Sequence, residues 1–408
     1  MNNYYPDVTI PGIFRNRVSY YRNDVFLKSR GPDFWIDLCW EEAYIKANAI
    51  SSYLINYGVM PGDRIGIYSE NRAEWILADL GILSTGSTDV TIDPSCSASE
   101  AASIIIDSDI RICFCSGRRQ AENLLLVRSG LPALEQIIVF SHGDYKQVPV
   151  ITLDRLIQEG LANDRSEDIE TRIRSIDPGD IMTAIYTMSP SGHPRKITLS
   201  ADDILRELRG VTGLQPNLIR DVVLSMLPLS HPLERILGYY RVMHAGGTIA
   251  YSRGTDRLAR DLSDIRPTAM VCTPRVAEKL YGIIQEIASK SPALRMFMYR
   301  WAKKTALEAA PFFDAGRHLP GMLKRKYALA GSHVFLPVRA AAGIDRLGAL
   351  FIGEAPVPEV VRNFFIGLGL YMVPVGSLAD TSQGPPAMHK KAAGDYTPAG
   401  AKSRFRAR

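Results

Sequence analysis

The segment 185–199 reads IYTMSPSGHPRKITL, and it decides how the rest of the chain is interpreted. The apolar run at 181–187 predicts a strand, and a loop of serine, proline and glycine follows before Arg195 and Lys196. Backbone N–H groups and hydroxyls of such loops bind phosphate oxygens, and nearby cations compensate the phosphate charge. The segment therefore predicts a phosphate-binding loop after a strand, although loops of this composition also occur without a ligand.

Short apolar segments alternate with amphipathic segments on both sides of this loop. Helical spacing of apolar residues is found at 43–57, 74–83 and 99–107, and Ser97 or Ser99 is the expected N-cap of the last helix. Strands are predicted at 64–68, 89–92, 111–115, 136–140, 221–227, 248–251, 269–272 and 347–352. This alternation favours an α/β protein with mostly parallel sheets. A polar, weakly patterned stretch at 163–179 separates the first region from the second.

Length and composition are those of an ordinary globular protein. The chain has 408 residues, of which 46% are hydrophobic and 22% charged, so it can bury a large core and form two or three sublobes. Residues 1–15 lack the apolar core of a signal peptide. The apolar run at 363–379 is short and rich in glycine and proline, so we expect a helix end followed by a buried strand there, not a membrane span.

The five cysteines are scattered, which indicates a reducing compartment and not a disulfide framework. We therefore expect a cytoplasmic protein. Cys113 and Cys115 alternate along an apolar run and should share one face of a strand. Because no histidine or further cysteine accompanies them at ligand spacing, we interpret them as small buried residues and not as metal ligands.

The net charge of +5 belongs to the end of the chain. Residues 383–408 carry six cations and one anion, so the preceding residues are balanced. This tail has no periodic apolar pattern and is predicted to be disordered. We expect a solvated tail and no specific nucleic-acid partner, with contact to nucleic acid or an acidic membrane as the alternative.

The segment 291–330 differs from the rest because eight cations face only two acids, with aromatic residues between them. A pair of basic amphipathic helices could contact an anionic membrane surface peripherally. The alternative is a surface excursion whose long cationic side chains cover apolar area while their charges stay in water.

Four further blocks extend the pattern around the loop: GVMPGDRIGIYSENRAEW at 58–75, LPLSHPLERILGYY at 227–240, DIRPT at 264–268 and TPRVAEKLY at 273–281. Together with the loop they resemble the long-chain fatty acid–CoA ligase branch of the adenylate-forming (AMP-binding) superfamily. The resemblance covers residues 7–382. It implies the two α/β sublobes, with mostly parallel sheets, of the large N-terminal domain. It also implies descent from enzymes that activate fatty acids with ATP and Mg²⁺ and pass the acyl group to coenzyme A.

The family loop reads YTSGTTGxPKG, and this chain departs from it at several positions. The resemblance assigns phosphate binding to Thr187, Ser191, Gly192, Arg195 and Lys196. Against the pattern, the chain has a thioether at Met188, a ring without an N–H at Pro190, and Lys196 where the family has glycine. Each lost charge-assisted hydrogen bond is worth about 1.5–3 kcal/mol. We expect a basic loop that attracts phosphate weakly without positioning three phosphates.

The adenine segment departs further. The family motif GYGLTETS aligns with VGSLADTS at 375–382, so the adenine-stacking tyrosine is replaced by Gly376 and the phosphate-binding threonine by Ala379. Asp380 replaces the glutamate that helps to hold Mg²⁺, and its side chain is one methylene shorter. The resemblance also places nucleotide contacts at positions that the chain keeps, namely Gly353, Ala355, Pro356 and Thr381.

The resemblance stops after residue 382. The family continues with a TGD motif, a hinge and a C-terminal domain that supplies a catalytic lysine, and no counterpart follows here. The sequence thus predicts a first part of the large domain at 1–178, a second part at 179–382 with the loop and adenine segment, and the tail at 383–408. We expect the C-terminal domain to be absent and coenzyme A not to be bound.

The segment 227–235 lines the acyl side of the pocket in the family, so the resemblance implies acyl contacts for His231 and Glu234. A single histidine is equally expected as a structural hydrogen-bonding residue. Three hypotheses follow. The first is a truncated, catalytically impaired member of the ligase family that binds an acyl chain. The others are a working fatty-acid-activating ligase completed by a separate chain, and a lipid- or membrane-surface-binding protein.

Overall fold

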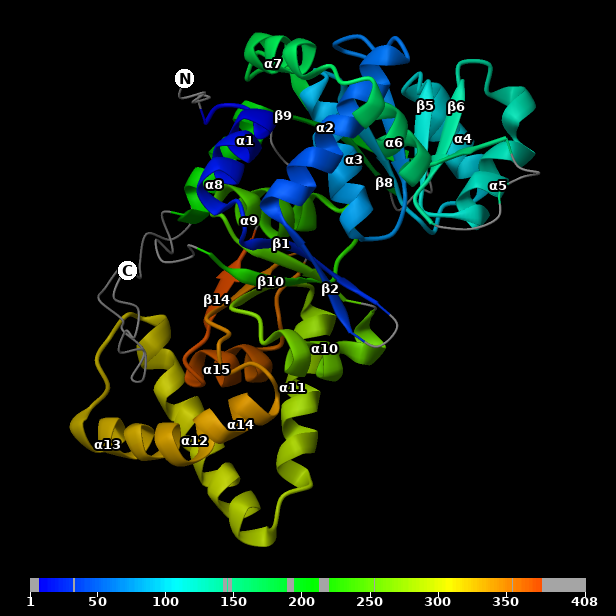
Figure 1. The fold of residues 1–408 in the computed structure, drawn as a ribbon. Helices are drawn as coiled ribbons and strands as arrows, with labels where there is room; N and C mark the ends of the chain where they lie inside the picture. The colour runs from blue at the N-terminus through cyan, green and yellow to red at the C-terminus, as the bar shows by residue number, and fades with distance from the viewer. Residues whose placement is uncertain are drawn as a thin grey trace. The chain divides into compact units, whose positions relative to one another are not determined.

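The computed structural model describes residues 7–31, 34–141, 145, 149–188, 194–212, 220–252, 254–353 and 355–375 (Figure 1). These residues form two compact units. Unit 1 takes its residues from Met1–Arg220 and Leu227–Tyr251, and unit 2 from Asp221–Met226 and Ser252–Arg408. The segment boundaries that the sequence motifs suggest, at 178 and 382, remain a prediction.

The main sheet of unit 1 has seven strands in the order β7-β6-β5-β3-β4-β8-β9. Their bounds are β3 (Arg64–Tyr68), β4 (Thr88–Ile92), β5 (Ile112–Cys115), β6 (Gln136–Val139), β7 (Ile151–Thr152), β8 (Ile181–Met188) and β9 (Pro194–Ser200). All neighbours pair in parallel except β8 and β9, which are antiparallel. The carboxyl ends of β3, β4 and β8 therefore lie at one edge, where side chains of a functional site gather in such sheets.

Three more strands of unit 1 form a second group, in which β1 pairs in parallel with β11 and antiparallel with β2. They are β1 (Val25–Arg30), β2 (Trp35–Cys39) and β11 (Thr248–Tyr251). The helices of unit 1 are α1 (Ile10–Tyr21), α2 (Trp40–Asn56), α3 (Ala73–Ser84), α4 (Ala98–Asp107), α5 (Arg118–Leu126), α6 (Leu153–Ala162), α7 (Ser166–Ser175), α8 (Ala201–Thr212), the π-helical turn η2 (Glu234–Tyr240) and α9 (Arg241–His244). A capping box of Ser97 and Glu100 begins α4, which confirms Ser97 as the predicted cap.

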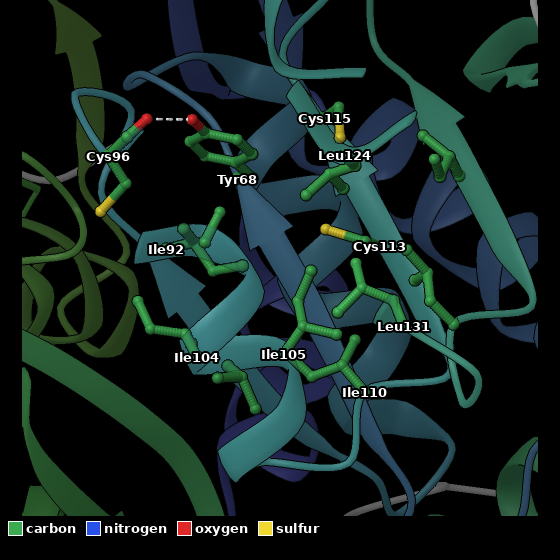
Figure 2. Packing of buried hydrophobic residues seen from close by; sticks show 14 of the residues in the cluster. Tyr68, Ile92, Cys96, Ile104, Ile105, Ile110, Cys113, Cys115, Leu124 and Leu131 are labelled. Atoms are coloured by element: carbon green, nitrogen blue, oxygen red, sulfur yellow. Dashed lines mark hydrogen bonds between the residues drawn. The ribbon is translucent and has the colours of Figure 1, made fainter. Parts of the chain in front are cut away.

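One face of the main sheet packs against α4 and α5 in a continuous apolar cluster (Figure 2). Cys113 and Cys115 lie in this cluster without solvent exposure, as predicted for small buried residues on one strand face. Burial raises the pKa of the Cys115 thiol, which keeps it neutral. The hydroxyl of Tyr68 donates to the carbonyl of Cys96 and so remains satisfied at the rim of the cluster.

Unit 2 has four parallel strands in the order β10-β12-β13-β14. They are β10 (Val222–Ser225), β12 (Ala269–Cys272), β13 (Ala349–Ile352) and β14 (Tyr371–Pro374). Its helices are α10 (Leu258–Ile265), α11 (Pro274–Ser289), α12 (Ala293–Asp314), α13 (Gly321–Ala330), α14 (Leu336–Ala341) and α15 (Glu359–Gly367), with a π-helical turn η4 (Gly331–Phe335) between α13 and α14. Because α15 ends shortly before β14, the helix end and the strand predicted at 363–379 are confirmed, but the strand buries only Val373 and is not the fully buried strand expected. Both units are α/β with mostly parallel strands, as the sequence predicts.

Two expectations need correction. The stretch 163–179, interpreted as weakly patterned, contains α7, which buries only Ile169 and Ile173 against Ile55 of α2. A helix with two buried residues one turn apart gives almost no periodic signal. Residues 194–200, not predicted as a strand, form β9 and turn the segment after β8 into a hairpin. In the described part of the chain, the helices are too short or too polar to cross a lipid bilayer.

Candidate functional site

The predicted phosphate-binding loop connects β8 and β9. In the hairpin, Tyr186 is opposite Lys196 and Thr187 is opposite Arg195. Cross-strand partners share a sheet face and successive residues alternate between faces. The register therefore pairs the backbone of Thr187 with that of Arg195 at the end of the hairpin, one position beyond Tyr186 and Lys196. Ser191 and Gly192, also assigned to phosphate binding, lie outside the described residues.

The charge of Lys196 is compensated by α4. Its ammonium lies 3.4 Å from Oδ2 of Asp107 and 5.5 Å from the ring centroid of Tyr186. The Tyr186 hydroxyl donates to Asp107 and lies 2.6 Å from the Ser108 hydroxyl. The hydrogen bond from Tyr186 and the lysine charge hold the pKa of Asp107 below its usual range, while burial raises the pKa of Tyr186. Lys196 thus belongs to a polar cluster beside the hairpin.

The described flanks of the loop carry two cations, Arg195 and Lys196. A triphosphate needs several N–H and hydroxyl donors together with cations that face it. Met188 contributes a thioether without a donor, and the ammonium of Lys196 is held by Asp107. Arg195 is exposed. The described residues contain no group of three or more acidic, histidine or cysteine side chains suited to a metal ion, and Asp380 and Thr381 lie beyond them.

The segment that carries His231 is held at the carboxyl edge of the main sheet. Asn71, which follows β3, donates through Nδ2 to the carbonyl of Leu227 at 2.6 Å and accepts the N–H of Leu229 at 2.7 Å. Asp93, which follows β4, accepts the Ser230 hydroxyl at 2.9 Å. Three hydrogen bonds from two neighbouring strand ends therefore fix the backbone immediately before His231.

His231 has a defined hydrogen-bonding role on one side of its ring. The ring Nδ1 of His231 accepts the backbone N–H of Leu233 at 3.2 Å. The backbone N–H of His231 donates to the carbonyl of Pro228 at 2.8 Å. A neutral imidazole that accepts at Nδ1 carries its proton on Nε2. The ring therefore combines a structural hydrogen bond with an Nε2–H donor. Its acyl contact remains a prediction from the resemblance.

Glu234 and Arg235 begin the π-helical turn η2 and are fully buried. Arg235 donates to Asp79 and Asp89, each at 2.6 Å, and its guanidinium lies 4.3 Å from the Trp75 ring. Desolvation raises the pKa of Asp79, and the two carboxylates raise the pKa of Arg235. This cluster anchors η2 to α3 and β4. Whether Glu234 contacts an acyl chain is left as a prediction.

The predicted nucleotide contacts Gly353, Ala355 and Pro356 follow β13 in unit 2. The N–H of Ala355 donates to the carbonyl of Gly353 at 3.0 Å, which makes a tight turn at the carboxyl end of the strand. This turn is described within unit 2, whereas the loop hairpin and His231 belong to unit 1.

Sequence reasoning missed Asn71, Asp93 and Asp107. Asn71 and Asp93 carried a usable signal, because each is a polar residue placed directly after a buried parallel strand. Asp107 carried none, because it ends an ordinary amphipathic helix 79 residues before Tyr186 in the chain. Its contact depends on the pairing of β8 with β9.

Comparison with known proteins agrees with this architecture. The profile of the AMP-binding enzyme family matches residues 14–378, so the chain belongs to that family. Long-chain-fatty-acid–CoA ligase FadD15 of Mycobacterium bovis is 30% identical over 353 residues, covering 86% of this chain and 57% of the relative. Long-chain-fatty-acid–CoA ligase ACSBG2 of Xenopus laevis is 28% identical over 390 residues, covering 92% of this chain and 52% of the relative. The chain thus spans about half the length of these curated relatives.

Solved structures show the same fold. The A-PCP didomain of carboxylic acid reductase from Segniliparus rugosus, in complex with AMP, superposes with a TM-score of 0.67 at 18% identity, covering 90% of this chain and 51% of that one. A putative long-chain-fatty-acid CoA ligase from Rhodopseudomonas palustris gives a TM-score of 0.61 at 17% identity, covering 89% of this chain and 74% of that one. The structural likeness confirms the expected fold of the N-terminal domain of adenylate-forming enzymes.

Proposed function

We propose that this chain is a member of the fatty acid–CoA ligase family whose phosphate loop has lost the ability to hold ATP for adenylation. The ion pair of Lys196 with Asp107 supports the proposal, because a lysine that Asp107 holds cannot replace donors that the loop has lost. Met188 and Pro190 add two positions without the donors of the family pattern.

The size of the expected effect follows from the number of missing donors. Charge-assisted hydrogen bonds contribute about 1.5–3 kcal/mol each, and about 1.4 kcal/mol corresponds to a tenfold change in binding. Two or three missing contacts would therefore weaken nucleotide binding by several orders of magnitude. ATP, Mg²⁺ and coenzyme A are consequently the ligands that we expect to bind poorly.

We further propose that the acyl side of the pocket is retained. Asn71 and Asp93 hold the backbone before His231, so this segment keeps a defined conformation without help from a nucleotide. The named relatives are long-chain-fatty-acid–CoA ligases, which makes a fatty acid the acyl ligand to test. The five free cysteines agree with the expected cytoplasmic location.

Fatty-acid-dependent exchange of pyrophosphate into ATP tests the proposal on the purified chain. We expect exchange at background level, together with saturable binding of a fluorescent fatty acid. The matched variant restores the family residues at the departing positions: Met188→Ser, Ser189→Gly, Pro190→Thr and Lys196→Gly. This variant should gain ATP binding. Exchange above background in the unmodified chain would favour a working ligase instead.

Contact with a lipid surface is the second candidate function. It is favoured by exposed apolar side chains among cations in the segment 291–330, such as Leu294 and Met322, which are 72% and 75% exposed. Exposed apolar groups surrounded by positive charge are typical of peripheral membrane contact.

A further inference from the structure

Helix α13 packs against the rest of unit 2 through a narrow stripe of three side chains. Ala330 is buried and Leu323 and Tyr327 are half-buried, whereas the other seven residues of the helix are exposed. The Tyr327 ring packs edge-on against Phe313 of α12 at 5.0 Å and lies 5.6 Å from Phe335 of η4. The stripe fixes the helix beside the C-terminal half of α12 and leaves its opposite face uncovered by the described residues of unit 2 (Figure 1).

The uncovered face combines apolar and basic side chains. Met322 and Leu329 lie seven residues apart, or about two turns, and are 75% and 56% exposed. Arg325 and Lys326 lie between them at spacings of three and four residues from either end, which places all four on one side of the helix. Lys324 is also exposed but lies on the other flank of the helix, about 100° around the axis from Arg325, and adds a third cation there. We call these five residues the α13 face.

The stretch of sequence that contains α13 carries charge of one sign. From 321 to 344 the sequence has four lysines and arginines, one histidine and no acid. The acids of the neighbouring helix α12 are Glu308 and Asp314, and Asp314 is ion-paired with Arg362 of α15. Nothing within α13 itself therefore compensates its cations. Two protruding apolar side chains among cations that no acid of α13 compensates would contact the acyl boundary and the anionic headgroups of a bilayer together.

We propose that the α13 face binds the surface of an anionic phospholipid bilayer. The partner is inferred from charge, because the three cations of the α13 face are complementary to anionic lipid headgroups. Each cation near an anionic surface contributes to binding, and the apolar pair adds a short-range contribution that salt does not screen. This proposal goes beyond the loss of adenylation and does not depend on it, because unit 1 provides none of the five residues.

Vesicle co-sedimentation tests the proposal with the full chain. Vesicles of phosphatidylcholine with phosphatidylglycerol should bind the protein, whereas pure phosphatidylcholine should bind it poorly, and binding should fall as salt rises. Changing the cations together, K324Q/R325Q/K326Q, should lower the partition coefficient about fivefold per cation. The pair M322S/L329S should lower it at least about tenfold. All five side chains are exposed, so thermal unfolding of the variants should match the parent chain.

Two matched variants distinguish binding through the α13 face from nonspecific binding through any exposed apolar side chain. Leu126 ends α5 in unit 1 and is 79% exposed, so L126S removes an exposed leucine elsewhere and should leave binding unchanged. Phe297 is exposed on α12, near its opposite end, and F297S should also leave binding largely unchanged. Equal binding to neutral and anionic vesicles, or loss of binding with F297S and not with M322S/L329S, would overturn the proposal. A chain that stays in solution with both vesicle types would indicate a merely solvated helix and would overturn it as well.

Discussion

Lys196 and Asp107 form an ion pair of 3.4 Å between the start of β9 and the end of α4. The pair explains how a lysine can occupy a position where the family pattern has glycine without adding a cation to the loop. The Tyr186 hydroxyl donates to the same carboxylate and the Tyr186 ring lies beneath the ammonium, so the three residues stabilise one another. Lys196 thus belongs to a polar cluster beside the loop, whereas Arg195 occupies the position of the family's loop lysine.

Replacing Asp107 with asparagine should release this lysine. Because the pair is partly exposed, we expect a loss of about 0.2–1 kcal/mol in the free energy of unfolding at pH 7. The pKa of Asp107 is lower in the folded chain than its usual value of 3.8, so its contribution is present above 3.8 and disappears as the pH falls below that value. Urea unfolding of both proteins between pH 7 and pH 3 measures this. A difference that grows on acidification would contradict the ion pair.

Replacing Asn71 with alanine should loosen the segment before His231. The change removes a donor to Leu227 and an acceptor for the Leu229 N–H, and we expect a cost of about 1–3 kcal/mol in unfolding free energy. Amide hydrogen exchange at Leu229 should accelerate more than exchange in the neighbouring strands. Asn56 at the exposed end of α2 offers the control, since N56A removes side-chain hydrogen bonds away from this segment. Unchanged exchange at Leu229 in N71A would mean that other contacts hold the segment.

Removing Arg235 should be far more costly than removing one of its partners. R235M leaves Asp79 and Asp89 buried without a cation, and such a change costs about 3–5 kcal/mol. D79N leaves a one-to-one pair of Arg235 with Asp89 and should cost less. Desolvation already raises the pKa of Asp79, and R235M removes the cation beside it, so stability should fall further as the pH rises from 6 to 8. Guanidinium unfolding at several pH values checks this order. Equal costs for both variants would contradict the charge balance of the cluster.

Two glycines in helices of unit 2 should respond in opposite directions to alanine. A Cβ on Gly367 of α15 would lie 2.3 Å from the carbonyl oxygen of Ala306 in α12, so G367A forces two packed backbones apart. We expect a loss of about 1–3 kcal/mol. A Cβ on the exposed Gly282 of α11 would meet no atom within 4 Å, and G282A should stabilise by about 0.5–1 kcal/mol. Thermal unfolding distinguishes them. A neutral G367A would show that α12 and α15 can separate at little cost.

The parts of this fold that the sequence predicts are those with a local signal. The strands at 64–68, 248–251 and 269–272 match β3, β11 and β12, because each is a short apolar run bounded by turn residues. Helix α7 and strand β9 escaped prediction, since α7 buries too little and β9 depends on a partner across the loop. At the candidate site, the sequence indicates residue types but not their partners. The engagement of Lys196 by Asp107 depends on tertiary pairing that no spacing reveals.

The central claim is that the loop between β8 and β9 no longer holds a nucleotide triphosphate. Titration calorimetry of the purified chain with ATP and Mg²⁺ tests it most directly. We predict no saturable heat, corresponding to a dissociation constant weaker than about 1 mM. Saturable binding in the micromolar range that is lost when Arg195 is changed to alanine would contradict the claim and would restore the loop as a working ATP site.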